Sequence, residues 1–583
     1  MLGTAGQNLQ FIQTALLTIA QSWELMLWLI FYQLLFATLI AWLLEEAAIG
    51  DDVLPVLCFL GGILGFSLLG LAAISVGIKP DPQMKIAGLV LGGIILLWKR
   101  DRFFYLLAKT PPALVLFIFF VFLLRLIYIQ GLIVPSYADS LTHLQIVLDF
   151  MSPEKPPEAF FKLNMTIENY YHFGFHAVVA WLSGITETDP VQGILILGQY
   201  LQALCVLSLY PLATIISKNK HAAWIAMSTA AFFLPTPSHA SNWGKYPALA
   251  SMIGIAFVLA FLLIILNHPR PPWRFWAVLG MAALATFLLH SRSPVILLLL
   301  VLVYFVCLRS ETLLSLFKVD IRHNENFITA VVLLTVLLML FLMLLMVLEI
   351  HPVVAGVLFA VIAFVLFVDK TLTAVLIVFF FLVTGFLSFF LGGHLLPERF
   401  GAALDRPYIS IFLYQPVSIL VGMGIVAGIK WIAGNNAGIW FARASRCIVA
   451  AGIAYAILVQ SHLPSPCCIF VKDDDLFTYI WMNNNIPDNT LVGIAATGEP
   501  GNLLPADGGA WIEHFTGIPT RKIDTDEDFI GAHWRLCQER VTFFYLDDLD
   551  NSFDEYNLIE AGGLHQLSVG NVRIYSLDCS FLE

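Results

Sequence analysis

Long apolar stretches separated by short polar connections occupy the chain from about residue 24 to about residue 460. A membrane-spanning helix needs about 20 mostly apolar residues, and many of these stretches reach or approach that length. The candidate spans are 24–44, 53–78, 85–98, 112–134, 191–217, 222–236, 246–266, 274–290, 294–308, 327–348, 353–368, 371–391, 408–430 and 436–460. Residues 11–20 form either a further short segment or an extension of the first helix. The pattern predicts an α-helical polytopic membrane protein with roughly 12–14 membrane helices.

Composition supports this class and reveals a second part of the chain. The sequence is 59% hydrophobic and only 12% charged, whereas soluble domains carry about 25% charged residues. After Lys472 it becomes polar and acidic, and this tail alone is more negative than the whole chain with its net charge of −11. We therefore divide the chain into N-terminal membrane helices (1–110), a membrane domain (111–465) with an outer loop at 135–190, and a soluble domain (466–583). No basic tract indicates a nucleic-acid partner.

Lysine and arginine residues predict the orientation, because cytoplasmic connections of membrane proteins are enriched in them. They gather at 99–102, 218–220, 270–274, 309–322, 430 and 443–446. Placing these connections in the cytoplasm makes the spans alternate consistently from residue 99 onward. The outer loop and the C-terminal domain then lie on the extracytoplasmic side of a plasma (inner) membrane. Acidic residues at 45–52 leave the first three spans without an orientation.

The outer loop and the tail have patterns of their own. Residues 140–150 fit an amphipathic helix at the membrane interface, and residues 170–185 form a short apolar helix, either at the surface or re-entrant. In the tail we predict a helix at 477–484 and strands at 491–495, 541–546 and 572–576. Alternating helices and strands indicate a small α/β sandwich. Its four cysteines, Cys467, Cys468, Cys537 and Cys579, allow three full pairings, and one or two disulfides are expected outside the cytoplasm.

The first candidate functional residue is Asp139, which follows shortly after the span at 112–134. Ionisable groups at membrane depth are rare unless they face a cavity or a partner. His172 and His176 are four residues apart and share one face of a helix. We interpret Asp139 and this histidine pair as opposite walls of one site at the membrane surface. The alternative for Asp139 is a helix N-cap, a position that aspartate favours.

Several other outer-loop residues are candidates for substrate binding. In the loop at 242–247, Lys245 and Trp243 can meet a phosphate and a sugar face, and Tyr246 is a further substrate-binding candidate. The alternative is a lysine that extends to the membrane interface beside an interfacial tryptophan. Arg292 lies on the outer side against the positive-inside bias and is a phosphate ligand candidate. Arg399 binds phosphate or forms a local salt bridge. In the tail, Trp511 and Asp507 are candidates for binding a glycan. The alternative is that Trp511 belongs to the core and Asp507 to a turn.

Metal binding is an alternative role for the same loop. Asp139 and His143 lie one helical turn apart, and with His172 and His176 they could complete a ligand set for Mg²⁺ or Mn²⁺. The competing interpretation is that these histidines, His143 included, hydrogen-bond to a sugar or phosphate. The sequence itself requires no cofactor.

The layout resembles the GT-C superfamily of membrane glycosyltransferases, which includes oligosaccharyltransferases, protein O-mannosyltransferases and aminoarabinose transferases. The resemblance rests on a span that ends in an outer loop with an early acidic residue, Asp139, followed by a polytopic bundle and an outer soluble domain. The paired acidic residue of the family is absent, because Ala138 and Ser140 flank Asp139, and about three spans precede the loop. The resemblance implies transfer of a sugar from a polyprenyl-phosphate donor to a glycan, lipid or protein acceptor of the cell envelope, with Asp139 as general base.

Two other functions compete with this hypothesis. A transporter or flippase for lipid-linked or anionic substrates would place ionisable residues inside the spans, whereas here they gather at span ends. A non-catalytic GT-C-like scaffold is consistent with the missing second acidic residue.

Overall fold

The computed structural model describes residues 2–45, 49–152, 172–308, 406–434, 437–487, 490–498, 503–547 and 552–580. The predicted spans at 327–348, 353–368 and 371–391, and the candidate Arg399, lie outside these ranges. Contacts divide the chain into two compact units. The helical unit comprises residues 1–127, 147–240 and 246–462, and the loop–tail unit comprises residues 128–146, 241–245 and 463–583.

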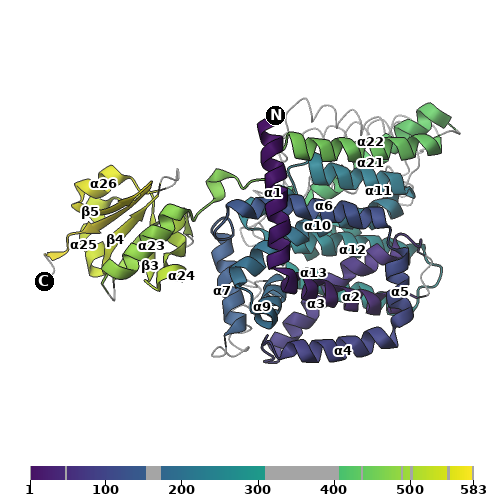
Figure 1. Ribbon diagram of the computed structural model, residues 1–583, viewed down its shortest axis with the longest axis horizontal. Coiled ribbons are helices and arrows are strands. Elements are labelled where there is room, and N and C mark those ends of the chain that lie inside the picture. The colour runs from purple at the N-terminus through teal and green to yellow at the C-terminus, as the bar shows by residue number, and fades with distance from the viewer. Residues whose placement is uncertain are drawn as a thin grey trace, which may run out of the picture. The chain divides into compact units, whose positions relative to one another are not determined.

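The helical unit is a multi-helix bundle built from the predicted apolar stretches (Figure 1). Its helices are α1 (Leu2–Gln21), α2 (Trp23–Leu43), α3 (Leu54–Ser75), α4 (Met84–Trp98), α5 (Arg100–Lys109), α6 (Pro112–Tyr128), α9 (Gly174–Thr186), α10 (Pro190–Ser217), α11 (Lys220–Ser228), α12 (Tyr246–Asn267), α13 (Trp273–Leu289), α14 (Ser293–Leu308), α20 (Arg406–Phe412), α21 (Tyr414–Ala433) and α22 (Ala437–Leu458). Among the described residues, seven segments are long and apolar enough to cross a membrane. The best-buried of them is α10, which packs against α11 and α12. The chain is therefore a multi-pass helical membrane protein, as predicted.

Short predicted spans behave differently from long ones. The stretches at 85–98, 274–290 and 294–308 are helices of 15 to 17 residues. The stretch at 222–236 is the nine-residue helix α11 followed by a π-helical turn at Thr229–Phe233. Residues 11–20 belong to α1, a helix separate from α2, and α1 runs across the direction of α6, α10 and α12 (Figure 1).

Polar contacts within the helical unit orient its first spans, which the sequence left open. Glu24 at the start of α2 pairs with Lys85 at the start of α4, at 2.6 Å. At the other ends of these helices Glu45 pairs with Arg102, and Asp51 pairs with Lys109 at 2.6 Å. Glu45 and Asp51 therefore lie on the same side as α5, which we call the basic side.

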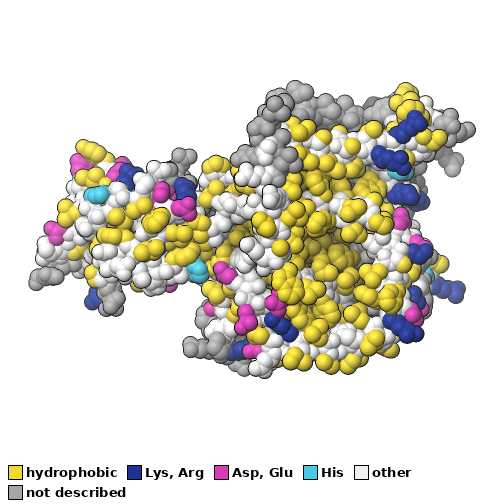
Figure 2. Space-filling model, in the orientation of Figure 1, with side chains coloured by type: hydrophobic (Ala, Val, Ile, Leu, Met, Phe, Trp, Pro, Cys, Tyr) yellow, Lys and Arg dark blue, Asp and Glu magenta, His cyan; other side chains and the backbone are white. Residues whose placement is uncertain are grey.

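Other contacts extend this sidedness along the chain. Gln192 at the start of α10 donates to the Ser22 hydroxyl at 2.9 Å, so α10 begins opposite the basic side. Tyr210 near the end of α10 donates to Asp52 at 3.1 Å on the basic side. Asn8 donates to the Ile457 carbonyl at 2.9 Å, so α22 ends near α1. Lysine and arginine side chains gather along one edge of the helical unit, beyond α5 and α11 (Figure 2).

The short apolar helix predicted at 170–185 is α9. All 13 of its residues are buried, and it packs against α3 and α10. Its 13 residues are too few to span a bilayer. Whether it lies at the membrane surface or is re-entrant stays a prediction.

The tail folds as a six-stranded mixed sheet with the order β2-β1-β4-β6-β5 and β3 paired to β1. Its strands are β1 (Leu491–Thr497), β2 (Leu504–Pro505), β3 (Thr520–Asp524), β4 (Val541–Leu546), β5 (Gly563–Val569) and β6 (Val572–Leu577). Its longer helices are α23 (Asp473–Asn485), α25 (Phe529–Gln538) and α26 (Glu555–Glu560), with a short α24 (Ile512–Thr516). Strand β1 is parallel to β3 and β4, whereas β6 is antiparallel to β4 and β5.

Helices cover both faces of this sheet. Tyr545 on β4 lies 6.4 Å from Tyr479 of α23, whereas its neighbour Phe544 lies 5.3 Å from Phe529 of α25, measured between ring centroids. Neighbouring residues of a strand point to opposite faces. The predicted α/β sandwich is confirmed.

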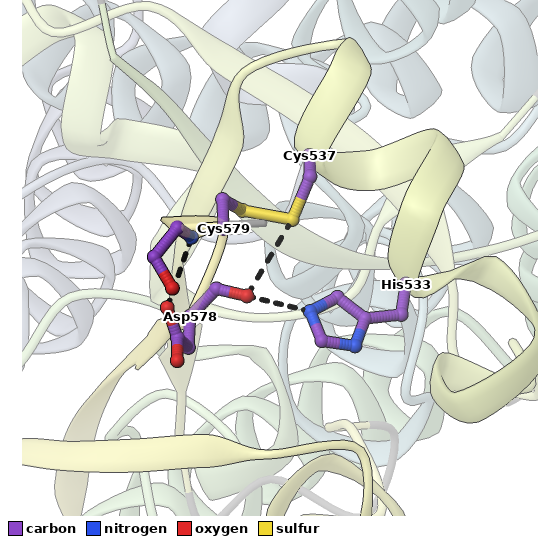
Figure 3. The surroundings of a disulfide bond; sticks show 5 residues. His533, Cys537, Asp578 and Cys579 are labelled. Atoms are coloured by element: carbon purple, nitrogen blue, oxygen red, sulfur yellow. Dashed lines mark hydrogen bonds between the residues drawn. A yellow bond between two sulfur atoms is a disulfide. The ribbon is translucent and has the colours of Figure 1, made fainter. Parts of the chain in front are cut away.

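A disulfide between Cys537 and Cys579 ties α25 to the segment after β6 (Figure 3). It links residues 42 positions apart, and a disulfide that closes such a loop typically stabilises a fold by about 2–4 kcal/mol. It is one of the pairings that the sequence allowed.

Candidate active site

Asp139 is the first residue of helix α7 (Asp139–Met151), at the point where the outer loop enters the helix. Its carboxylate forms an ion pair with the Lys245 ammonium, and each side chain is 27% exposed. Tyr137, two residues earlier, has a left-handed backbone (φ 67°), and its carbonyl accepts a hydrogen bond from the Ser140 N–H at 3.2 Å. The turn thus presents the carboxylate and its cation to solvent together.

Gly244 allows Lys245 to approach Asp139. Its φ of +62° is one that side chains rarely adopt, and a Cβ atom there would lie 2.6 Å from the Ser140 hydroxyl oxygen. Any other residue would push the two loops apart. The Gly244 carbonyl in turn accepts a hydrogen bond of 3.0 Å from His143 Nε2.

His143 is buried beneath this pair, with 3% of its surface exposed. Burial lowers the pKa of its imidazole to about 4, against the opposing effect of the Asp139 charge. The side chain is therefore neutral at physiological pH, with its proton on the nitrogen that faces Gly244. This arrangement gives His143 a role in holding the loop of Lys245 in place.

A third segment completes the loop framework. The Asn242 side-chain oxygen accepts hydrogen bonds of 3.0 Å from the Tyr128 hydroxyl and from the Ser465 N–H. The Tyr137 N–H donates to the Cys468 carbonyl at 3.1 Å, and the Tyr137 ring lies 5.7 Å from that of Phe470. Three segments distant in sequence therefore build one site within the loop–tail unit.

A cavity of about 640 Å³ opens in the same unit. It lies between the loop that follows α6 and the segment that leads into the tail domain. Its lining residues are Gln130, Gly131, Leu132, Ile133, Pro466, Cys467, Ile469, Val471, Lys472 and Asp473. This volume lies in the range of small-molecule sites.

The predicted histidine pair belongs to the helical unit, in an aromatic stack. The His172 ring lies 4.3 Å from the His290 ring, which lies 4.3 Å from the Tyr408 ring. The His176 ring is 6.4 Å from that of His172. The Tyr408 hydroxyl is 2.9 Å from the Ser251 hydroxyl oxygen. Four separate segments therefore meet at these histidines.

The structure thus brings the candidate residues together in two groups. Asp139, His143 and Lys245 form one site in the loop–tail unit. His172 and His176 lie in the helical unit beside His290, whose Nδ1 accepts a hydrogen bond of 3.3 Å from the Arg292 N–H. That the two groups are opposite walls of one site stays a prediction.

Three predicted ligands are buried in the structure. Tyr246 is fully buried, and its ring stacks on Phe175 at 5.9 Å. In the tail Trp511 is fully buried, and Asp507 accepts a hydrogen bond of 2.9 Å from the Gly509 N–H. Trp511 and Asp507 therefore follow the core-and-turn alternative, and Tyr246 occupies the environment of a packing residue.

Sequence reasoning missed the partners that shape the site. The Asp139–Lys245 pair joins positions 106 residues apart, and Tyr137 contributes through its backbone. Gly244 was the available signal, since a glycine before a lysine in an outer loop permits a close approach of two backbones.

Two predicted metal ligands, Asp139 and His143, have protein partners in the structure, and metal binding by them with His172 and His176 stays a prediction. The Asp139 carboxylate is paired with Lys245, and His143 directs a protonated nitrogen at a carbonyl. His533, Cys537 and Cys579 have ligand atoms within 4.8 Å of one another. Cys537 and Cys579 are already joined in the disulfide, and His533 Nε2 donates to the Asp578 carbonyl at 2.8 Å (Figure 3). These two cysteines could bind a metal only as thiolates, and the disulfide excludes that form, so this group is structural.

No protein-family model and no curated protein matches the chain. Among solved structures it is similar to the oligosaccharyltransferase of Archaeoglobus fulgidus in complex with Zn and sulfate, with 13% identity, 80% of this chain and 73% of that chain covered, and a TM-score of 0.38. The same enzyme tethered with an acceptor peptide containing the NVT sequon gives 11% identity, 80% and 74% coverage and a TM-score of 0.36.

The chain is also similar to the arabinofuranosyltransferase AftD from Mycobacteria, with 13% identity and a TM-score of 0.32. This match covers 80% of this chain but only 40% of AftD. By name these structures are an oligosaccharyltransferase and an arabinofuranosyltransferase. The likeness is remote, and it assigns no donor, acceptor or catalytic residue to this chain.

Proposed function

We propose that the protein is an integral membrane glycosyltransferase that moves a sugar from a polyprenyl-phosphate donor to an acceptor on the extracytoplasmic face. The observation that carries this proposal is the accessible Asp139–Lys245 pair at the head of α7. It joins a base and a cation, the two groups that such a transfer needs.

In the proposed reaction Asp139 acts on the acceptor. Its carboxylate accepts the proton of the attacking hydroxyl or amine as the new bond to the anomeric carbon forms. A base must lie within hydrogen-bond reach of this proton, and the exposed position of Asp139 gives an acceptor that access. An aspartate paired with a lysine carries the negative charge that a base needs.

Lys245 acts on the donor. The bond between the anomeric carbon and the phosphate oxygen breaks, and the polyprenyl phosphate leaves with the bonding electron pair. A nearby ammonium group stabilises the charge that develops on this oxygen. Because the pair is partly exposed, Lys245 can turn from Asp139 to the phosphate at little energetic cost.

The other site residues have supporting roles in this proposal. His143 and Gly244 hold the Lys245 loop against α7. Arg292 and the histidines His172 and His176 are the proposed contacts for the rest of the donor, and Arg399 retains its predicted phosphate role. The extracytoplasmic face of a plasma membrane is proposed from the distribution of lysine and arginine residues along the chain.

The test is sugar transfer by purified protein in lipid vesicles with a panel of polyprenyl-phosphate sugars. We expect Asp139→Asn to reduce transfer by about 10²–10⁴-fold, the usual contribution of a general base. Its thermal unfolding should change little, because an exposed ion pair contributes about 0–1 kcal/mol. Asp149→Asn, on the same helix, is the matched control and should retain transfer. Normal transfer by Asp139→Asn would refute the mechanism.

A further inference from the structure

The tail contains a second pair of cysteines whose state follows from the first. Four tail cysteines permit three complete pairings. With Cys537 and Cys579 joined, the pairing left within the tail is Cys467 with Cys468. These adjacent residues form a short 3-10 turn, Pro466–Cys468, and their sulfur atoms are 2.8 Å apart. The two sulfurs are in contact and not bonded.

The surroundings favour oxidation of this pair. Cys467 is exposed and lines the cavity of about 640 Å³, so a soluble thiol reagent can reach it. Cys468 is buried, and burial raises the pKa of its thiol. Cys467 is therefore the thiol that reacts first with an oxidant, and Cys468 then reacts with Cys467. The Cys537–Cys579 bond in the same unit indicates an oxidising compartment.

We propose that Cys467 and Cys468 form a vicinal disulfide that anchors the loop of Asp139. The Cys467 thiolate attacks a small disulfide such as oxidised glutathione and releases one glutathione thiol. The Cys468 thiolate then attacks the Cys467 sulfur of the mixed disulfide and displaces the second glutathione thiol. Two protein thiols are oxidised, one disulfide is reduced, and the two protons leave with the released thiols.

The position of the pair connects it to the candidate active site. The Cys468 carbonyl accepts the Tyr137 N–H at 3.1 Å, and Tyr137 begins the turn that presents Asp139. A ring closed between adjacent residues restricts the backbone at this carbonyl. Adjacent Cα atoms lie closer than in an ordinary disulfide, and Cys467 is exposed, so the bond is reduced more readily than an ordinary structural disulfide. The redox state of the pair therefore controls how firmly the Tyr137 turn is held.

The first test is differential alkylation of the full-length protein purified without reductant. Free thiols are blocked with N-ethylmaleimide under denaturing conditions, and disulfides are then reduced and labelled with iodoacetamide. The chymotryptic peptide of residues 459–470 contains both cysteines and no other cysteine. Without reduction, this peptide should be lighter than the dithiol form by two hydrogens and should carry no maleimide. The Cys537–Cys579 bond serves as the internal control for preserved oxidation.

Maleimide on both Cys467 and Cys468, with Cys537 and Cys579 protected, would overturn the proposal, as would linkage of either cysteine to another partner. This assay measures no sugar transfer, so its failure is distinct from failure of the proposed function.

The second test measures hydrogen exchange of the Tyr137 amide. Reduction should cause loss of protection in the wild-type protein. The double variant Cys467→Ser with Cys468→Ser is the matched control. Among its described cysteines, reductant can act there only on the Cys537–Cys579 bond, and the Tyr137 amide should stay unchanged. Equal protection of this amide before and after reduction of the pair would overturn the anchoring role.

Discussion

Two lysine–aspartate pairs lie in the loop–tail unit, and they differ in their access to water. Asp139 and Lys245 are each 27% exposed. In the tail, the Asp547 side chain is 1% exposed, and its carboxylate lies 3.7 Å from the ammonium of Lys472, which is 35% exposed. One pair can open toward a ligand, whereas the other contains a carboxylate that the fold has enclosed.

The tail pair belongs to a buried acidic cluster. Asp475 and Asp507 are fully buried nearby, and Asp475 accepts a hydrogen bond from Tyr545. Burial, and then the charge of Asp547, hold the pKa of Asp507 well above its usual range. Breaking a buried ion pair leaves an uncompensated charge. The comparison teaches that exposure decides which of two similar ion pairs a ligand can reach.

The largest expected difference between the pairs is in sugar transfer. Replacing Lys245 by Met should reduce transfer about 10²–10³-fold, because one stabilising group is lost from the departing phosphate. Lys472→Met should leave transfer unchanged at temperatures where the protein is folded. Initial rates of both variants in vesicles make this comparison. If Lys245→Met and Lys472→Met lost transfer equally, the functional distinction between the two ion pairs would be refuted.

The next difference is in the effect of pH on the framework beneath the exposed pair. Since burial lowers the pKa of His143 from 6.5 to about 4, the unfolded chain takes up a proton in this range while the folded protein does not. The contribution of neutral His143 to the free energy of unfolding is therefore fully present above pH 6.5. It is lost as the pH falls toward 4, and the loss is roughly 3 kcal/mol at most. Thermal unfolding of the wild type and of His143→Gln between pH 4 and 7 measures this loss. A wild-type pH dependence no steeper than that of the variant would contradict the assignment.

The smallest expected effect is on stability when each lysine is removed. Lys472→Met should lower the free energy of unfolding by roughly 2 kcal/mol, less than for a fully buried pair because the lysine is partly exposed. Lys245→Met should change it by about 0–1 kcal/mol. Limited proteolysis of the tail and thermal unfolding report these values. A greater destabilisation by Lys245→Met would show that the exposed pair is structural.

The helical part of the fold was predictable because hydrophobic length is a local signal. The long stretches that became α2, α3, α10 and α12 are read directly from their apolar residues. Strands β1, β4 and β6 are mostly buried and were also predicted. Strands β3 and β5 were missed because most of their side chains are partly or fully exposed. The sequence pattern of such strands resembles that of a loop.

The residues of the candidate site could be predicted from the sequence but their pairing could not, because the contact is not local. Asp139 and Lys245 were both named as candidates, but no periodicity relates positions 106 residues apart. The orientation of the first spans likewise depended on the Glu45–Arg102 and Asp51–Lys109 pairs, which no charge count reveals. Exposure, which separates Asp139 from Asp547, is a property of the folded chain alone.

The most direct test of the exposed pair as a reaction site is a cryo-EM map of the purified protein with added polyprenyl phosphate. We predict phosphate density within hydrogen-bond distance of the Lys245 ammonium, with the Asp139 carboxylate beside it and the Lys472–Asp547 pair unchanged. Lipid phosphate found only elsewhere, with Lys245 still bound to Asp139, would contradict the account.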